Sequence, residues 1–452
     1  MQQEQPNDWD VCIMGLGYVG LTLAITMADV GFRVIGVEIR KDICHLLEKG
    51  HAHFREPGLD DKIQRVTREN SFKAMTNIPR NWQGKVFIIT VGTPLNTQKE
   101  SCSDMIENVA REISIFLKDG DLVIMRSTVK LGTTRQTVLP ILDKSRKKYD
   151  LAFCPERTIE GKALIELRQL PQIVGGTTKE AMIRASQLFQ HITPTVIRVS
   201  DVETAEMIKL IDNTQRDVAF AYANEVARVC DAIGISATEV IQAGKLGYPR
   251  TNLPMPGLVG GPCLEKDSYI LTESLKELGV EPKITMAARY LNERQPGEVI
   301  GQLKKMTEEV SGFPRTLRIV LLGLAFKGQP ATDDLRGTMA RPLLEELRRS
   351  FPTASFYGFD AVVPPEEIQA FGLQPIVELE AAFQDAHLIL IVNNHPLFSM
   401  MPIEDYMHLM QRPGLVYDFW NGFKSEDLHL PKEVGYMALG SHGKIRFGED
   451  QN

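Results

Sequence analysis

The first two hundred residues alternate short apolar runs with stretches in which apolar residues recur at helical spacing. Residues 10–14 (DVCIM) lead directly into the glycine-rich segment 15–20 (GLGYVG), and a stretch with helical spacing follows. A second apolar run, at residues 32–37, ends on Glu38. This alternation predicts a doubly wound α/β domain over residues 1–200. Further apolar runs belong to the same pattern and lie at residues 86–91, 122–125, 151–153, 173–174 and 196–199.

A long stretch without proline runs from Asp201 to Gly234, with apolar residues at helical period. It predicts one long helix, which a single small domain could not cover. We therefore expect this helix to span two domains or to pack against a second subunit. A loop rich in glycine and proline follows at residues 247–263, and more helices are expected to about residue 310.

Apolar runs return after the SGFPRT segment at residues 311–316. The run at 317–322 ends on Gly323, and helical and strand-like segments alternate beyond it. The sequence thus predicts an α/β protein with two Rossmann-like doubly wound domains, joined by a long central helix and a helical middle domain. The predicted domain boundaries are 1–200, 201–312 and 313–452.

Composition and charge restrict the class of protein. The 452 residues are 43% hydrophobic, 24% charged and 7% aromatic, which is typical of a globular chain. The net charge is −7, from 51 Lys and Arg against 58 Asp and Glu, and this disfavours nucleic acid as a partner. No apolar run approaches the ~18 residues of a membrane span, and the N-terminus lacks the pattern of a secretion signal. We therefore expect a cytoplasmic protein without membrane insertion.

The glycine-rich segment carries the first candidate chemistry. Gly15, Gly17 and Gly20 stand between a predicted strand and a predicted helix, where they permit a tight turn and a close approach of the backbone to a pyrophosphate. Glu38 follows 18 residues after Gly20, where a carboxylate can accept hydrogen bonds from ribose hydroxyls. This arrangement favours NAD over NADP, although Arg40 nearby leaves NADP open. The alternative is a glycine turn that holds no cofactor.

The six cysteines are scattered, without C-x-x-C spacing, which argues against a structural zinc site, any other metal site and a disulfide framework. Cys263 differs from the cysteines in apolar runs, because it follows Gly-Gly-Pro and precedes Leu-Glu-Lys-Asp. A helical turn starting here would place Asp267 on the same side, one turn away. A thiol beside glycines is accessible, and N–H groups at a helix start stabilise a thiolate. A loop cysteine without function remains the alternative. Core positions are predicted for Cys12, Cys154 and Cys230.

The predicted long helix carries a polar stripe at i, i+3, i+7 and i+10, formed by Glu206, Lys209, Asn213 and Arg216. Such a stripe is either a solvated face or a set of groups held in a cleft between domains. In a cleft, a lysine could stabilise an oxyanion or transfer protons. Residues 153–161 (FCPERTIEG) and 323–336 also follow predicted strands, at the ends where α/β sheets bind ligands, although charged loops are often only solvated.

These segments together resemble the nucleotide-sugar dehydrogenases, the UDP-glucose and GDP-mannose 6-dehydrogenase family. The resemblance covers roughly residues 10–400 in family order. It implies oxidation of the C6 primary alcohol of a UDP-linked sugar to a carboxylate with two NAD, in support of polysaccharide biosynthesis. The matching segments are GLGYVGLTLA, REPGL (55–59), VGTPL (91–95), STVKLGTT (127–134), CPERTIEG (154–161), the helix with Lys209 and Asn213, GGPCLEKD (260–267), GLAFK (323–327) with TDDLR (332–336), and NHPLF (394–398).

The resemblance also implies a mechanism. Cys263 would add to the aldehyde intermediate as a thiohemiacetal, whose oxidation gives a thioester that water cleaves. Lys209 would stabilise the oxyanion or handle protons, and Asn213 would orient the reacting oxygen. Asp267 would assist Lys209 and an ordered water.

Hydrolysis of the thioester falls, by the same resemblance, to Glu156, with Thr128 helping to hold the water. Arg250 would reach into a neighbouring subunit's site, which implies a homodimer or a higher homo-oligomer. The residues expected to bind NAD are Gly15, Gly17, Tyr18, Val19, Gly20, Glu38, Arg40, Thr93, Thr128, Lys327 and Arg336. Those expected to bind the nucleotide sugar are Glu156, Arg157, Glu160, Lys209, Asn213, Arg250, Gly257, Gly260, Phe326 and Lys327.

The identity of the sugar depends on finer features of the chain. The loop PRTNLPMPG (249–257) and NHPLF resemble the acetamido-sugar branch, so UDP-N-acetylmannosamine or UDP-N-acetylglucosamine is the expected substrate. UDP-glucose and GDP-mannose remain alternatives. A single-oxidation hydroxyacid dehydrogenase would share the dinucleotide domain and long helix but would not need Cys263. A non-catalytic nucleotide-sugar sensor would be expected to lack either the thiol or Lys209.

Overall fold

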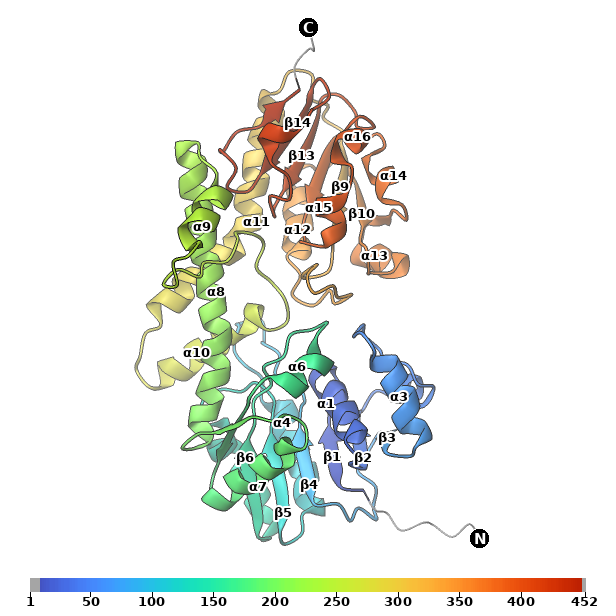
Figure 1. Ribbon diagram of the computed structural model, residues 1–452, viewed down its shortest axis with the longest axis vertical. Helices are drawn as coiled ribbons and strands as arrows, with labels where there is room; N and C mark the ends of the chain where they lie inside the picture. Colours follow the sequence, from blue (N-terminus) through green and yellow to red (C-terminus); the bar gives the residue numbers. More distant parts are fainter. Residues whose placement is uncertain (1–8, 449–452) are drawn as a thin grey trace. The chain divides into compact units, whose positions relative to one another are not determined.

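The structure is a computed structural model that describes residues 9–448 (Figure 1). The chain divides into two compact units. The first contains the residues up to 213 together with 269–281, and the second contains 214–268 and the residues from 282 onward. Two helices belong partly to each unit, α8 (Val202–Ile233) and α10 (Leu264–Glu277). The domain boundaries at residues 200 and 312 remain predictions.

The first unit is built on an eight-stranded sheet in the order β3-β2-β1-β4-β5-β6-β7-β8. Neighbouring strands are parallel except β6 and β7. Successive residues of β1 point to opposite faces, and both faces are buried, which explains its unbroken apolar sequence. The strands are β1 (Val11–Met14), β2 (Val34–Val37), β3 (Phe72–Met75), β4 (Val86–Ile89), β5 (Asp121–Met125), β6 (Tyr149–Phe153), β7 (Gln172–Gly176) and β8 (Val196–Arg198).

Helices cover both faces of this sheet. Residues of α1 and α3 belong to the core on one face, and residues of α4 and α5 belong to the core on the other. The strand order reverses between β1 and β4, so the carboxyl ends of these strands form the switch point where such sheets bind ligands. The helices are α1 (Tyr18–Asp29), α2 (Lys41–Glu48), α3 (Leu59–Arg68), α4 (Asp104–Phe116), α5 (Leu139–Leu142), α6 (Ala163–Gln169) and α7 (Lys179–Gln190), with a π-helical turn at Thr134–Val138.

The second unit contains a seven-stranded sheet in the order β11-β10-β9-β12-β13-β14-β15. Its neighbouring strands are parallel except β14 and β15. The strands are β9 (Arg318–Leu322), β10 (Ser355–Phe359), β11 (Gln374–Pro375), β12 (Leu388–Ile391), β13 (Gly414–Asp418), β14 (Val434–Ala438) and β15 (Arg446–Phe447). The helices that lie wholly in this unit are α9 (Ala237–Lys245), α11 (Lys283–Glu309), α12 (Ala340–Ser350), α13 (Pro365–Phe371), α14 (Leu379–Phe383), α15 (Pro396–Met400) and α16 (Ile403–Met407).

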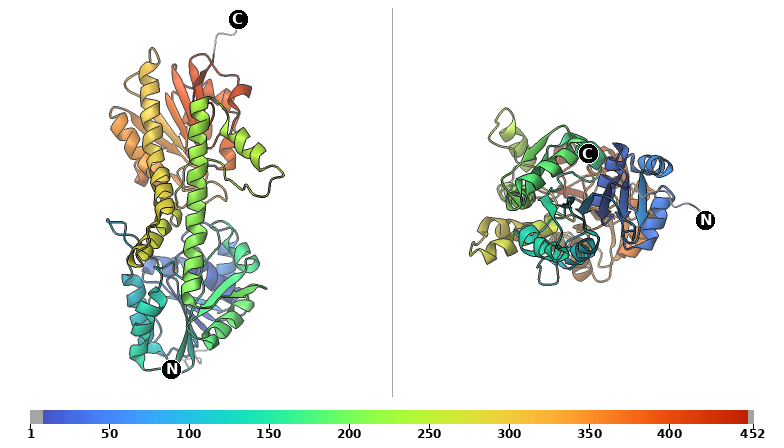
Figure 2. Two further views of the ribbon diagram at one scale, coloured as in Figure 1. Left: turned by 90° about the vertical axis from the view of Figure 1, so that its left-hand side faces the viewer. Right: turned by 90° about the horizontal axis from the view of Figure 1, so that it is seen from below.

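The predicted fold class is confirmed, and so is the single long helix. The helix α8 is unbroken over 32 residues and is drawn in green in Figure 2. It stops where Gly234 adopts φ +77°, a left-handed conformation that costs glycine little and that commonly ends helices. Within residues 9–448, no helix is both long and apolar enough to cross a membrane.

Candidate active site

The glycine turn follows β1 and leads into α1. Gly15 has φ +96°, and a Cβ atom placed on Gly20 would lie 1.9 Å from the carbonyl oxygen of Gly15. Gly17 occupies the N-cap of α1, which has no side-chain cap. The N–H groups of the first helical turn can therefore bind the phosphates of a dinucleotide. The tight packing at Gly15 and Gly20 explains why neither position accepts a side chain.

Glu38 lies at the end of β2, beside the glycine turn. One of its carboxylate oxygens accepts a hydrogen bond from the N–H of Leu16 at 3.1 Å, and the other accepts one from the N–H of Arg40 at 3.0 Å. The exposed side chain of Arg40 forms an ion pair with Asp42. The carboxylate is thus fixed beside the glycine turn, and the guanidinium of Arg40 already has an acidic partner.

Replacement of Glu38 by serine tests this arrangement. We expect kcat/KM for NAD to fall by about 10- to 100-fold, because a hydrogen bond to a charged group contributes roughly 1.5–3 kcal/mol. Activity with NADP should rise, because the repulsion of a 2′-phosphate is removed and Arg40 remains. Steady-state kinetics with both cofactors measure the change. An unchanged ratio of kcat/KM between the two cofactors would contradict the assignment of Glu38 to the ribose.

Tyr18 connects the glycine turn to the loop after β6. Its hydroxyl donates a short hydrogen bond to the buried carboxylate of Glu56, and the N–H of Gly161 donates to the same carboxylate oxygen at 2.7 Å. Burial raises the pKa of Tyr18, and the hydrogen bond to Glu56 raises it further. Glu56 thus holds together segments that the sequence analysis considered separately. Glu56 belongs to the REPGL segment, and its position in the sequence did not predict this contact.

Glu156, at the start of the same loop, forms an ion pair with a residue that the sequence analysis missed. The guanidinium of Arg126 donates to its carboxylate at 2.6 Å and also donates to the carbonyl oxygen of Cys154 at 3.0 Å. Both charged side chains are almost fully buried. The N–H of Thr158 donates to the other carboxylate oxygen. Arg126 directly follows an apolar strand, at the end where α/β sheets bind ligands. This position in the sequence could have marked it as a candidate.

The surroundings of Glu156 keep it ionised. Burial alone would raise the pKa of Glu156, but the charge of Arg126, the hydrogen bond from Thr158 and the charge of Lys209 together lower it to about 2. The carboxylate is therefore a good hydrogen-bond acceptor at neutral pH and a weak base.

The depressed pKa of Glu156 predicts a pH dependence of stability. The ordinary value is 4.5 and the value in the folded chain is about 2, so this contribution is fully present above pH 4.5 and is lost as the pH falls toward 2. It amounts to about 3 kcal/mol. Thermal unfolding between pH 7 and pH 2 should show a smaller loss of melting temperature for Glu156→Gln than for the unchanged protein. Parallel curves would contradict the assignment.

The helix α8 brings Lys209 and Asn213 into the first unit on a buried face. Both side chains are buried, as is Glu206 three residues before Lys209. Arg216, which the sequence analysis placed in the same stripe, is exposed instead. Lys209 lies close enough to Glu156 for its charge to help lower the pKa of that carboxyl. The interpretation of the stripe as a merely solvated face is therefore wrong for Glu206, Lys209 and Asn213.

Glu206 holds the STVKLGTT segment against α8. Its carboxylate accepts hydrogen bonds from the N–H of Gly132 at 2.6 Å and from the N–H and the hydroxyl of Thr134 at 2.9 and 2.6 Å. Thr128, in the same segment, accepts a hydrogen bond at its carbonyl oxygen from the hydroxyl of Thr93 at 2.6 Å. The structure thus joins two residues that were expected to bind the cofactor, Thr93 and Thr128.

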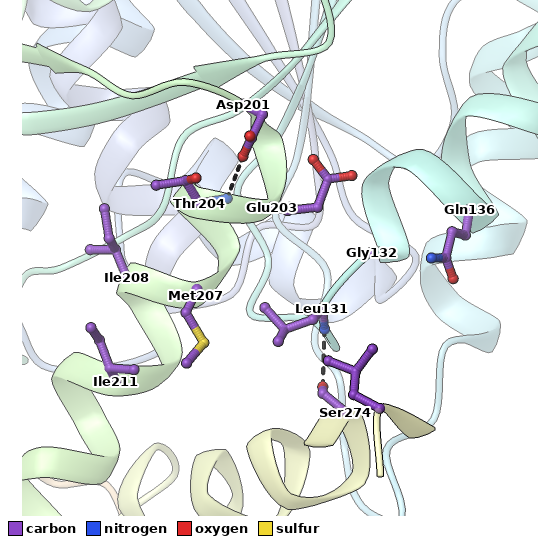
Figure 3. A pocket seen from close by; sticks show the side chains of 11 residues that line it. Leu131, Gly132, Gln136, Asp201, Glu203, Thr204, Met207, Ile208, Ile211 and Ser274 are labelled. Carbon is purple, nitrogen blue, oxygen red and sulfur yellow. Dashed lines mark hydrogen bonds between the residues drawn. The ribbon is translucent and has the colours of Figure 1, made fainter. Parts of the chain in front are cut away.

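An open cavity of about 630 Å³ lies between the first turns of α8, the STVKLGTT segment and the end of α10 (Figure 3). Its acidic groups already have partners, because Glu203 pairs with Arg135 at 2.6 Å and Asp201 accepts from the N–H of Thr204 at 2.7 Å. No residue predicted for the site lines it. The cavity is therefore separate from the residues predicted for the site. The lining residues are Leu131, Gly132, Gln136, Asp201, Glu203, Thr204, Met207, Ile208, Ile211, Ser274 and Leu278.

In the second unit, Cys263 stands at the start of α10. Its side chain is exposed, and its carbonyl oxygen accepts a hydrogen bond from the N–H of Asp267 at 2.9 Å, which closes the first helical turn. Asp267 is buried. Gly261 has φ +100°, and a Cβ atom there would lie 2.4 Å from the ring of Phe326. The predicted helical turn from Cys263 to Asp267 is confirmed, and Phe326, expected to bind the sugar, packs against the same loop.

Other residues expected at the site have protein partners of their own. Arg157 pairs with Asp212 at 2.9 Å, and Arg336 pairs with Asp334 at 2.6 Å. The guanidinium of Arg250 lies 5.4 Å from the ring centre of Tyr248. Cys12, Cys154 and Cys230 are buried, as predicted for core cysteines, and none of the six cysteines, all of which are described, is in a disulfide.

A doubly wound sheet with a glycine turn after its first strand and a carboxylate at the end of its second is typical of dinucleotide-binding enzymes. Residues 9–193, 203–294 and 320–425 match, respectively, the NAD binding, central and UDP binding domains of the UDP-glucose/GDP-mannose dehydrogenase family. The chain is similar to the UDP-N-acetyl-D-mannosamine dehydrogenase of Pyrococcus horikoshii, with 33% identity over 86% of this chain and 90% of the relative. It is also similar to the Campylobacter jejuni protein of that name, with 34% identity over 75% and 83% of the two chains.

Solved structures agree with these relatives. A UDP-D-ManNAc dehydrogenase structure from Pyrococcus horikoshii superimposes with a TM-score of 0.86 at 29% identity and covers 96% of this chain and 100% of its own. The UDP-N-acetyl-mannosamine dehydrogenase Cap5O of Staphylococcus aureus gives a TM-score of 0.81 at 28% identity, over 95% and 98% of the two chains. The chain belongs to the UDP-glucose/GDP-mannose dehydrogenase family. It is an NAD-dependent oxidoreductase that acts on nucleotide sugars.

Proposed function

We propose that the enzyme oxidises the C6 primary alcohol of UDP-N-acetylmannosamine to the carboxylate in two steps. The observation that carries this proposal is the exposed Cys263 thiol, which ends a glycine-rich loop at the start of α10. A second oxidation at the same carbon needs a nucleophile, because an aldehyde has no suitable hydride to give until a group adds to it. The names of the relatives support the acetamido sugar.

In the first oxidation, bound NAD supplies the acceptor for the hydride. The proton of the C6 hydroxyl passes to water. The amide of Asn213 orients the C6 oxygen, and the ammonium group of Lys209 stabilises the negative charge that develops on that oxygen. Both side chains are buried, so these interactions are stronger than they would be in water. Arg157, Glu160, Arg250, Gly257, Gly260, Phe326 and Lys327 are proposed to hold the nucleotide sugar. Thr93, Thr128, Lys327 and Arg336 are proposed to join the glycine turn and Glu38 in holding NAD.

In the second oxidation, the sulfur of Cys263 adds to the aldehyde carbon and gives a thiohemiacetal. Asp267 lies on the next turn of α10. Its carboxylate assists Lys209 and an ordered water. Loss of the remaining C6 hydride to a second NAD, and of the hydroxyl proton to water, then gives a thioester.

Water cleaves the thioester and releases the carboxylic acid together with the Cys263 thiol. Glu156 is ionised and held rigidly by Arg126, so we assign it the orientation of the attacking water through a hydrogen bond. Thr128 holds the same water. A carboxylate with so low a pKa is a weak general base, and orientation rather than proton storage is the role that its surroundings favour.

Purified enzyme with NAD and each of four nucleotide sugars tests the substrate assignment. We expect turnover with UDP-N-acetylmannosamine and little with UDP-N-acetylglucosamine, UDP-glucose or GDP-mannose. Turnover with UDP-glucose alone would contradict the acetamido assignment and leave the family membership intact. We further propose that the acid product is made in the cytoplasm and feeds polysaccharide biosynthesis.

We also propose that the enzyme is a homodimer or a higher homo-oligomer. Within the second unit, α8 exposes Tyr222, Val229 and Ile233, which are spaced by seven and four residues and therefore share one face. Exposed apolar residues continue beyond the helix at Leu246 and Tyr248, close in sequence to Arg250. Exposed apolar residues that gather on one helix face are typical of an interface. Sedimentation equilibrium tests the proposal, and a monomer at micromolar concentration would contradict it.

A further inference from the structure

The loop that leads to Cys263 is fixed at Gly257 by a buried amide. The side chain of Asn224, on α8, donates to the carbonyl oxygen of Gly257 at 3.0 Å and accepts from the N–H of the same residue at 2.9 Å. A Cβ atom on Gly257 would lie 2.7 Å from the ring of Trp420, so this residue is closed in from the other side. Gly257 is thus held by a two-point contact that leaves its backbone little freedom.

A buried guanidinium holds the same loop further along. Arg289, on α11, donates to the carbonyl oxygen of Val259 at 3.3 Å and to that of Leu264 at 3.0 Å. These two carbonyl groups stand on either side of the segment Gly260-Gly261-Pro262-Cys263. The side chain of Arg289 is only 1% exposed, so these hydrogen bonds are formed away from water.

Asp217 joins these contacts into one network. One of its oxygens accepts from Arg289 and from the amide of Asn292, each at 2.8 Å. Its other oxygen accepts from the hydroxyl of Ser268 at 3.0 Å, one turn of α10 beyond Cys263. The amide nitrogen of Asn224 in turn donates to the amide oxygen of Asn292 at 3.1 Å. The network therefore reaches the loop before the cysteine and the helix after it.

Stability alone does not explain such a network. Apolar residues of similar volume commonly stabilise an interior as well as a buried ion pair does, because the pair first has to be desolvated. Directed hydrogen bonds, in contrast, hold the backbone groups that they bind in a single position. Here those groups belong to Gly257, Val259 and Leu264, and the residue that they leave exposed is the nucleophile.

We propose that Asn224, Asp217, Arg289 and Asn292 are positioning residues that fix the Cys263 thiol for attack on the aldehyde. This inference rests on the proposed two-step function. A displacement of about 1 Å between reacting atoms lowers a rate by roughly 100-fold, so a loosened loop should slow the thiol-dependent step severely. The first oxidation does not use the thiol and should be spared.

Asn224→Ala tests the proposal, because it removes both hydrogen bonds to Gly257. Hydroxylamine traps the aldehyde, so NADH formed in its presence reports the first oxidation, and the 6-aldehyde of the nucleotide sugar supplied as substrate reports the second. We expect the second step to fall by at least about 30-fold and the first by less than about three-fold, with the KM for NAD unchanged. Equal losses in both steps would overturn the proposal, because a merely structural role would affect them alike.

Asp231→Asn is the matched control on the same helix. Asp231 accepts from the N–H groups of Gly440 and Gly443, at 3.1 and 2.8 Å, and has no part in the network. This variant should lower the melting temperature without changing the ratio of the two steps. Ser268→Ala is a smaller change and keeps the proposal testable even if Asn224→Ala fails to fold. It should slow the second step about three-fold more than the first. An unchanged ratio in Ser268→Ala and Asn224→Ala would overturn the proposal.

The same assays separate this inference from the proposed function. If the unchanged enzyme forms one NADH per sugar and no acid, the two-step function itself is wrong. If it forms two NADH and the variants lose both steps equally, only the positioning role is wrong.

Discussion

Replacement of Cys263 by serine is expected to lower the rate of carboxylate formation by at least about 1,000-fold. A serine hydroxyl is a far weaker nucleophile than a thiol at neutral pH, and an ester is a more stable intermediate than a thioester. Oxidation of the alcohol should continue, so the variant should form one NADH for each aldehyde that hydroxylamine traps. NADH absorbance and mass spectrometry of the products measure both quantities.

Cys102→Ser is the matched control for this prediction, because Cys102 is the other cysteine of the chain that is not buried. It should form acid at the rate of the unchanged enzyme. If Cys263→Ser also made the full carboxylate at the normal rate, the thioester route would be wrong, and hydration of the aldehyde would have to replace it.

Replacement of Lys209 by methionine is expected to slow both oxidations by about 100- to 1,000-fold. Loss of one preorganised group that stabilises an oxyanion costs roughly 2.7–4 kcal/mol in the transition state. Lys209 is buried, so water cannot readily replace its charge. Methionine keeps most of the side-chain volume, which limits the change in packing. The effect should appear in kcat for the alcohol and for the aldehyde, with little change in the KM for NAD.

Lys179→Met provides the control, because Lys179 is the exposed first residue of α7. Its kinetics should match those of the unchanged enzyme. If Lys209→Met kept more than about a third of kcat in both steps, the assignment of the oxyanion to Lys209 would fail, while the role of Cys263 would stand.

The fold could be predicted from the sequence because its signals are local. The apolar run of β1 needs burial on both faces, Gly15 and Gly20 need space that only glycine leaves, and α8 has no breaker before Gly234. Cys263 was found for the same reason, because its glycine neighbours and the start of α10 lie within a few residues of it. Each of these features can be recognised from adjacent positions in the chain.

The partners of the site residues could not be predicted, because they are distant in sequence. Arg126 meets Glu156 across 30 positions, and Arg289 meets Asp217 across 72. No spacing rule links such residues before the fold is known. The polar stripe on α8 shows a smaller error. Arg216 is exposed although, at about 100° per residue, it points within about 20° of the buried Lys209. The spacing of residues on a helix therefore does not show how far along the helix a face stays buried.

The stoichiometry of the reaction tests the central claim, that one site oxidises the same carbon twice, most directly. NADH and uronic acid are quantified after complete conversion of a known amount of UDP-N-acetylmannosamine. We predict two NADH and one acid for each sugar consumed. One NADH for each sugar, with the aldehyde or a ketone as the product, would contradict the double oxidation and support a single-oxidation dehydrogenase.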